Sequence, residues 1–226
     1  MFVSKYSQFL TVILVVLIIG ILGTVGYFAY DTLIIKSKNN NAKDVVEEFS
    51  KNVRRETVDN NDNEDVELDE NLLDSVNSIQ SEKVSETQAE KVYMEGYEVM
   101  GTIKIPKIGL EYPILSEVTK KSLETSVAIL YGVGLNQPGN TTIVGHNYRN
   151  GLFFSNNSKL SKGDTIDITD QSGQTIAYSI YDMFMTSPND AEYMQRDTEG
   201  AREISLSTCN NDSSQRLVIL AREKEN

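Results

Sequence analysis

Residues 202–222 read REISLSTCNNDSSQRLVILAR, two strand-like segments around a short polar loop. The segments 202–209 and 216–222 are apolar and β-branched, and the loop NNDSSQ between them is rich in turn-forming residues. Sequential strands joined by so short a loop usually pair antiparallel. The stretch therefore predicts a β-hairpin with Cys209 and Arg216 at the same edge of a sheet.

Six further segments upstream have the same short, alternating, β-branched character. They are MGTIKIP (100–106), LEYPIL (110–115), SVAILYG (126–132), TTIVGH (141–146), DTIDITD (164–170) and TIAYSIYDMFM (175–185). Helical spacing is weak except around residues 116–125. Eight such strands predict an antiparallel barrel or sandwich in a folded domain over 93–226. About 130 residues suffice for one core without disulfides.

The N-terminus carries a long uncharged run, Phe9 to Tyr30, between Lys5 and Asp31. As a helix this run is long enough to cross a bilayer core of roughly 30 Å, so 9–30 is predicted to be a transmembrane helix. A cleavable signal peptide is the alternative, but its apolar region is shorter and a small-residue cleavage site is hard to find here. We expect residues 1–8 to form a cytoplasmic tail, with the rest exported.

Between helix and domain, residues 31–92 are polar and acidic. Residues 36–91 contain no proline or glycine and very few aromatic residues. Such a segment buries too little apolar surface to offset chain entropy, so a largely disordered linker or stalk is predicted. Two pieces, AKDVVEEFSKNVRRE and NLLDSVNSIQ, have some helical spacing. The acidic excess supplies most of the net charge of −12, which argues against nucleic acid as a partner.

Cys209 and His146 are the only cysteine and histidine in the chain, and both stand at ends of predicted strands. A single thiol forms no internal disulfide. Cys209, His146 and Arg216 each have an alternative explanation without catalysis. Cys209 could be a buried small side chain, His146 a turn residue and Arg216 a solvated charge at a sheet edge. The hairpin brings Cys209 and Arg216 together, whereas His146 joins them only if its strand lies alongside.

If the three residues meet, their chemistry is coherent. A thiol attacks as thiolate, and a nearby imidazolium or guanidinium stabilises that form. Histidine could protonate a departing amine and deprotonate an incoming one. Arginine keeps its proton, so Arg216 could hold an oxyanion or hydrogen-bond the substrate backbone.

These residues carry a resemblance to the sortases, the membrane-anchored cysteine transpeptidases of Gram-positive bacteria. ISLSTC followed by RLVILA resembles the sortase Thr-Leu-X-Thr-Cys signature, with Ser205 in the first position and Leu206, Thr208 and Cys209 matching. NTTIVGHNYRNGLFFSNNSKLSKGD (140–164) is similar to the sortase histidine, paired-phenylalanine and Leu-x-x-Gly-Asp sequence, and IPKIGLEYPIL (105–115) to the domain start. The resemblance covers about residues 100–222.

The resemblance implies a closed eight-stranded β-barrel with short helices and a role for each site residue. Cys209 becomes the nucleophile, His146 the acid/base and Arg216 the residue that holds the oxyanion or positions the substrate. Thr208 and Ser207 would bind the peptide beside the nucleophile. The segment from about 186 to 202 would select the sorting signal.

The implied substrate is an LPXTG-like sorting peptide of a surface protein, transferred to an amino group of a cell-wall precursor. The sequences GHNYRN and LSTCN are similar to class B sortases, but the interval between His146 and Cys209 is short for the long helix of that class. The chain also ends soon after its last strand, whereas pilin-polymerising class C sortases often have a C-terminal membrane helix. A class A or class D type is therefore expected.

No cofactor is expected, although some sortases bind calcium and modulation by calcium stays open, because the acidic residues are too scattered to define a cage. Two other readings stay open. One is a cell-wall cysteine hydrolase, in which the cysteine usually precedes the histidine and opens a helix. The other is a membrane-anchored binding module without catalytic activity.

Overall fold

The computed structural model describes residues 5–59 and 91–224 of the 226-residue chain. Its elements are α1 (Lys5–Asp59), β1 (Tyr93–Met94), β2 (Tyr97–Ile105), η1 (Pro106–Ile108), β3 (Leu110–Leu115), α3 (Lys120–Thr125), β4 (Val127–Gly132), β5 (Gly139–Val144), η2 (Phe154–Lys159), β6 (Thr165–Asp170), β7 (Thr175–Thr186), η3 (Glu192–Met194), β8 (Arg202–Cys209) and β9 (Arg216–Glu223). The chain divides into two units, 1–41 and 42–226.

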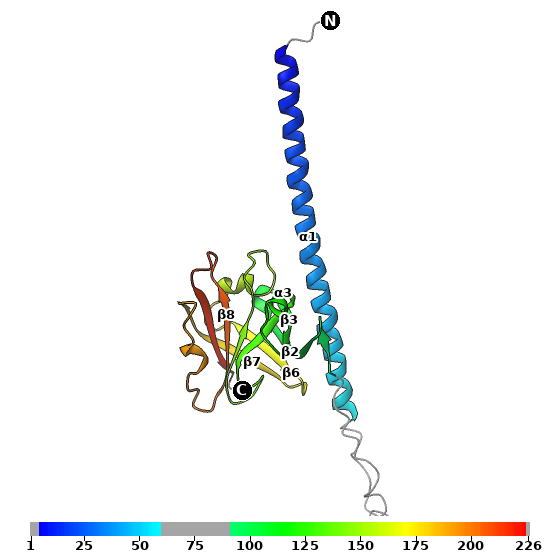
Figure 1. Cartoon of the computed structure of the whole chain (residues 1–226). Helices are drawn as coiled ribbons and strands as arrows, with labels where there is room; N and C mark the ends of the chain where they lie inside the picture. The colour runs from blue at the N-terminus through cyan, green and yellow to red at the C-terminus, as the bar shows by residue number, and fades with distance from the viewer. Residues whose placement is uncertain (1–4, 60–90, 225–226) are drawn as a thin grey trace, which may run out of the picture. The chain divides into compact units, whose positions relative to one another are not determined.

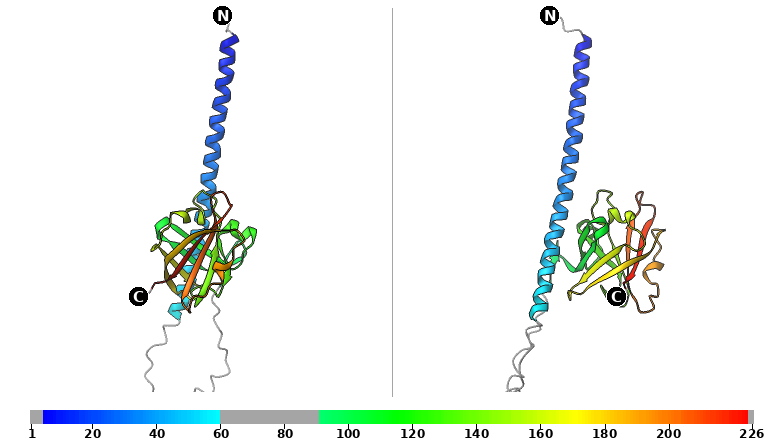
Figure 2. Two further views of the ribbon diagram at one scale, coloured as in Figure 1. Left: turned by 90° about the vertical axis from the view of Figure 1, so that its left-hand side faces the viewer. Right: turned by 180° about the vertical axis from the view of Figure 1, so that it is seen from behind.

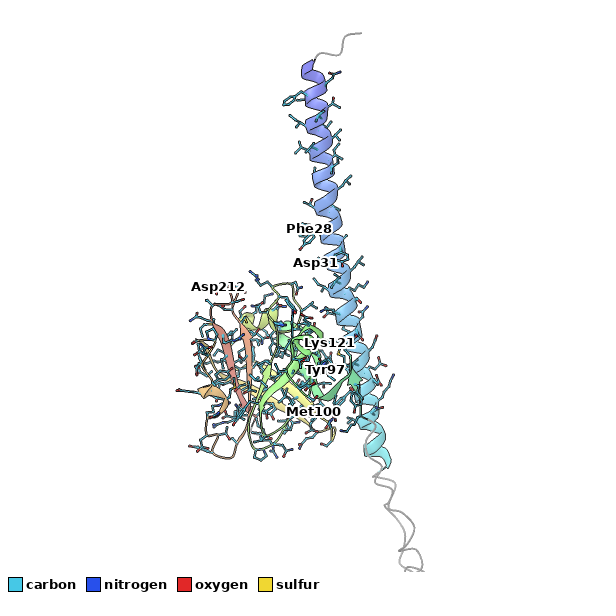
Figure 3. The ribbon with its side chains drawn as sticks, viewed as in Figure 1. Phe28, Asp31, Tyr97, Met100, Lys121 and Asp212 are labelled. Atoms are coloured by element: carbon cyan, nitrogen blue, oxygen red, sulfur yellow. The ribbon has the colours of Figure 1, made fainter. Side chains whose placement is uncertain are left out.

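The N-terminal unit is helical over its described residues, 5–41. It contains the uncharged run of α1, whose large apolar side chains are exposed, Phe9 by 63% and Phe28 by 69%. Figure 3 labels Phe28 and Asp31, near the point where the charged residues begin. This helix is long and apolar enough to cross a membrane. Such exposed apolar surface is unfavourable in water, so the helix fits a transmembrane span.

The helix continues beyond the predicted span, and this corrects the disordered linker expected over 31–92. Residues 31–59 are helical, because no glycine or proline interrupts them and a Glu47–Lys51 pair of 2.7 Å bridges one turn. Val45, Val46 and Phe49 recur at helical spacing and are buried within the second unit. The remainder of the predicted linker, 60–90, lies outside the described residues.

Eight strands of the second unit close into a barrel, as predicted (Figure 1). The order is β2-β3-β4-β5-β8-β9-β7-β6, and pairing of β2 with β6 closes the ring. The short strand β1 pairs antiparallel with the start of β2. Each strand predicted from sequence is present. The expectation of antiparallel pairing is only partly met, since β3 pairs with β4 and β5 with β8 in parallel. Both views in Figure 2 show the closed arrangement.

The parallel pairing of β5 with β8 depends on a crossover connection between β7 and β8. Strands β7 and β8 both pair antiparallel with β9, so they run in the same direction. Residues 187–201 must therefore return along the barrel from the end of β7 to the start of β8. Inside the barrel, Ile204 and Leu206 of β8 join a core that includes Ile143 and Ile219, all at most 1% exposed. The core fixes the register of β8, since a one-residue slip would move these side chains out of the core and onto the polar face of the strand.

Candidate active site

Cys209 and Arg216 face each other across the β8–β9 hairpin, in Figure 1 the orange and red strands. They are the last pair in the antiparallel register, and the Arg216 Nη1 donates to Cys209 Sγ at 2.6 Å. The connecting loop, with Asp212 at its tip in Figure 3, is short enough to hold them together. The pairing that the sequence predicted for these two residues is confirmed.

His146 comes to the same edge because β5 lies beside β8. The two strands pair in parallel from Gly139↔Arg202 to Val144↔Ser207, and the Gly145 N–H continues the pattern by donating to the Ser207 carbonyl at 3.3 Å. His146 is the next residue. The same register places it alongside the end of β8, where Cys209 stands.

The His146 imidazole is packed against an aromatic ring. Its centroid lies 4.8 Å from that of Tyr148, whose ring in turn lies 5.9 Å from Phe153. The His146 carbonyl accepts from the Phe154 N–H at 3.1 Å. Burial, with a smaller contribution from the Glu124 charge, raises the pKa of the Tyr148 phenol. Tyr148 is therefore neutral at pH 7 and adds no negative charge beside the histidine.

The arrangement can carry out nucleophilic acyl transfer. It combines a thiol, a guanidinium in hydrogen-bond contact with the sulfur, and an imidazole at the same edge. A guanidinium carries several N–H donors, so Arg216 can donate to a developing oxyanion as well as to the sulfur. Over residues 5–59 and 91–224, no group of three or more histidine, cysteine or acidic residues could hold a metal ion.

The sequence model of the Sortase domain matches residues 103–224, which is more than half of the chain and contains all three residues. The chain belongs to the sortase family. It is 32% identical to Sortase A of Bacillus anthracis over 125 residues, which are 54% of this chain and 58% of that protein. The aligned part of this sortase thus spans less than two thirds of that relative.

Solved sortase structures share the fold. The crystal structure of sortase C-1 from Actinomyces oris matches with a TM-score of 0.52 at 25% identity, covering 57% of this chain and 75% of that one. The Clostridium perfringens Sortase D5 transpeptidase matches with a TM-score of 0.57 over 82% of this chain and 99% of that one, and its 24% identity supports the fold alone.

Two further residues predicted for this sortase site, Ser207 and Thr208, are each 3% exposed. The Thr208 hydroxyl donates to the Gly145 carbonyl at 2.7 Å, and the Ser207 hydroxyl accepts from the Tyr193 phenol at 3.1 Å. Both side chains are thus hydrogen-bonded within the protein. Their predicted contact with substrate stays a prediction.

A buried polar network, absent from the sequence predictions, secures the crossover 187–201 to the outer face of β8. The Glu203 side chain, 1% exposed, pairs with Arg196 of the crossover and with Arg222 of β9. Arg196 also donates to the Ser205 hydroxyl at 2.7 Å, and Asn140 of β5 donates to the Met194 carbonyl at 2.9 Å. The alternating pattern of β8 gave no sign that its polar face is covered.

Replacing Glu203, whose side chain is 1% exposed, by alanine should lower the free energy of unfolding by about 3 kcal/mol, because it leaves the partly buried Arg196 without its carboxylate. Chemical denaturation of the detergent-solubilised chain measures this. The matched control is Glu223→Ala, which breaks a 3.0 Å pair with Arg202 whose side chains are both 35% exposed. A cost of about 0.5 kcal/mol is expected there. Equal losses in the two variants would show that burial of the Glu203 pair is unimportant.

Proposed function

We propose that this sortase is a cysteine transpeptidase that cleaves an LPXTG-like sorting signal and transfers the acyl fragment to a cell-wall amino group. The observation that supports it most is the Arg216–Cys209 contact at the edge that His146 shares. Sorting-signal peptides of surface proteins and a cell-wall precursor amine are the proposed partners.

In the proposed reaction, the Cys209 sulfur attacks the scissile carbonyl and a thioester forms as the C–N bond breaks. His146 gives its proton to the departing amine, and Arg216 holds the oxyanion of the tetrahedral intermediate. An incoming amine then attacks the thioester, loses its proton to His146 and releases Cys209. Side chains fill every role, so the proposed cycle uses no cofactor; calcium could still modulate it.

The class A or class D type is part of this proposal. Between His146 and Cys209, all of which the structure describes, the helical segments are η2, of six residues, and η3, of three. The β7–β8 connection therefore lacks the long helix expected of class B. Relatives of types A, C and D are among the matches.

We also propose a single-pass topology, with residues 1–8 in the cytoplasm, the 9–30 span in the cell membrane and the catalytic domain outside. The uncharged stretch of α1 supports a span. Protease added to intact protoplasts should remove the barrel domain from the membrane fraction. Protection of the domain under these conditions would contradict the orientation.

The transpeptidase proposal predicts that an amine diverts product from acid to amide. A thioester reacts more readily with an unprotonated amine than with water, and His146 is proposed to take the amine's proton. The full chain in detergent is mixed with a panel of sorting peptides and amines, and the products are followed by mass. Total turnover should also rise where thioester breakdown limits the rate. If only hydrolysed peptide forms at saturating amine across the whole panel, the result would support a cell-wall cysteine hydrolase instead of a transpeptidase.

A further inference from the structure

We infer that Asn147 is a positioning residue that holds the Cys209 backbone in place beside His146. The inference rests on the proposed function, because the reaction gives this alignment its purpose. Asn147 directly follows the histidine, and its Nδ2 donates to the Cys209 carbonyl at 3.0 Å. It thus joins the segment that carries the acid/base to the residue that carries the nucleophile.

Side chains continue the β5–β8 pairing past the point where the strand ladder ends. The last backbone bond, from the Gly145 N–H to the Ser207 carbonyl, is already long at 3.3 Å. The Thr208 hydroxyl then donates to the Gly145 carbonyl at 2.7 Å, and the Asn147 amide to the Cys209 carbonyl. These contacts lie on either side of His146. They maintain the register of the two segments where regular backbone pairing no longer does.

The Asn147 amide is itself held in one orientation. Its Oδ1 accepts from the Arg149 N–H at 3.1 Å, and its Nδ2 makes a second contact of 3.2 Å with the Asn211 Oδ1 in the β8–β9 loop. The backbone of Asn147 forms an isolated bridge with Phe153. Both polar atoms of the side chain are therefore used, and one residue connects the histidine segment, the end of β8 and the hairpin loop.

Asn147 touches the carbonyl of Cys209 in the structure, and its proposed action on the thiol is indirect. The charged or titratable groups placed at that edge of the sheet with the thiol are Arg216 of β9 and His146 after β5. A shift of the Cys209 backbone would move the sulfur relative to both. Misplacement of reacting groups by about 1 Å can cost on the order of 10²-fold in rate.

The test compares two Asn147 variants with a control from the same loop. Asn147→Ala removes both polar atoms, whereas Asn147→Asp keeps the acceptor for the Arg149 N–H and loses the donor to Cys209. Asn150→Ala is the control, since the Asn150 Oδ1 accepts from the Leu152 N–H in a similar turn. The full chains in detergent are assayed for kcat and KM with a sorting peptide, for Cys209 alkylation by iodoacetamide at pH 7, and for thermal unfolding.

Both Asn147 variants should lose about 10-fold or more in kcat with KM within about twofold of wild type, and their alkylation should slow. Asn150→Ala should match wild type in both assays. Wild-type kcat and alkylation in Asn147→Asp would overturn the inference, as would a loss in kcat that merely follows a lower unfolding temperature in all three variants. If wild type forms no amide product while the Asn147 variants still alkylate slowly, the transpeptidase proposal fails and the positioning of Cys209 stands.

Discussion

Replacing Cys209 by alanine is expected to lower the rate of peptide cleavage and transfer by about 10⁴-fold or more. No other thiol exists in the chain to form the thioester. Cys209→Ser should be almost as inactive, because a hydroxyl is far harder to ionise than a thiol, even beside the Arg216 guanidinium. Product formation by the purified variants, measured by mass, is the readout.

Both Cys209 variants should remain folded. The side chain is only partly buried, and the removed or exchanged atom is small. Thermal unfolding within a few degrees of wild type is the control that separates a lost nucleophile from a lost fold. Residual cleavage by folded Cys209→Ala at the wild-type rate would rule out the cysteine mechanism and leave a non-covalent route or a binding module.

The second large effect is expected for Arg216→Lys, which keeps the positive charge. Lysine lacks the planar fork that can donate to the sulfur and to an oxyanion at the same time, so kcat should fall by about 10²-fold. Steady-state kinetics with the preferred peptide and amine measure this. The fall should appear in kcat more than in KM, since the oxyanion develops after substrate has bound.

A matched Arg→Lys change is available at the other end of β8. Arg202 pairs with Glu223 at 3.0 Å, and its strand position is seven residues from Cys209. Arg202→Lys should leave kcat within about twofold of wild type. If Arg216→Lys behaved like Arg202→Lys, the role of Arg216 would be reduced to charge alone.

The sequence predicted the local parts of this molecule well, for a physical reason. The hairpin that pairs Cys209 with Arg216 depends on adjacent strands and a six-residue loop, so alternation and turn composition suffice to define it. The uncharged run of α1 is equally local. Pairing of β5 with β8 depends instead on where the crossover 187–201 returns, and no periodicity within either strand carries that information.

Two other features were missed for related reasons. Glu203 lies in a strand whose polar positions alternate as they do on a solvent-exposed face, and only contacts with the crossover, such as that of Arg196, reveal that the face is covered. The helix over 31–59 was predicted as linker because its composition is polar and acidic. Composition shows how little core such a segment can form, but it does not exclude a helix, and the helical spacing noted in AKDVVEEFSKNVRRE (42–56) does lie within α1.

The parallel pairing of β5 with β8 also has a consequence for folding. His146 and Cys209 are 63 positions apart, and the chain must complete β6, β7 and the crossover before β8 can reach β5. Contacts of such long sequence separation form late, since loop closure costs entropy before the contacts are made. A nascent or partly folded chain therefore carries its thiol without its histidine neighbour. The thiol gains that neighbour only when the barrel is nearly complete, so under the proposed mechanism an unfolded chain lacks the acid/base that acyl transfer needs.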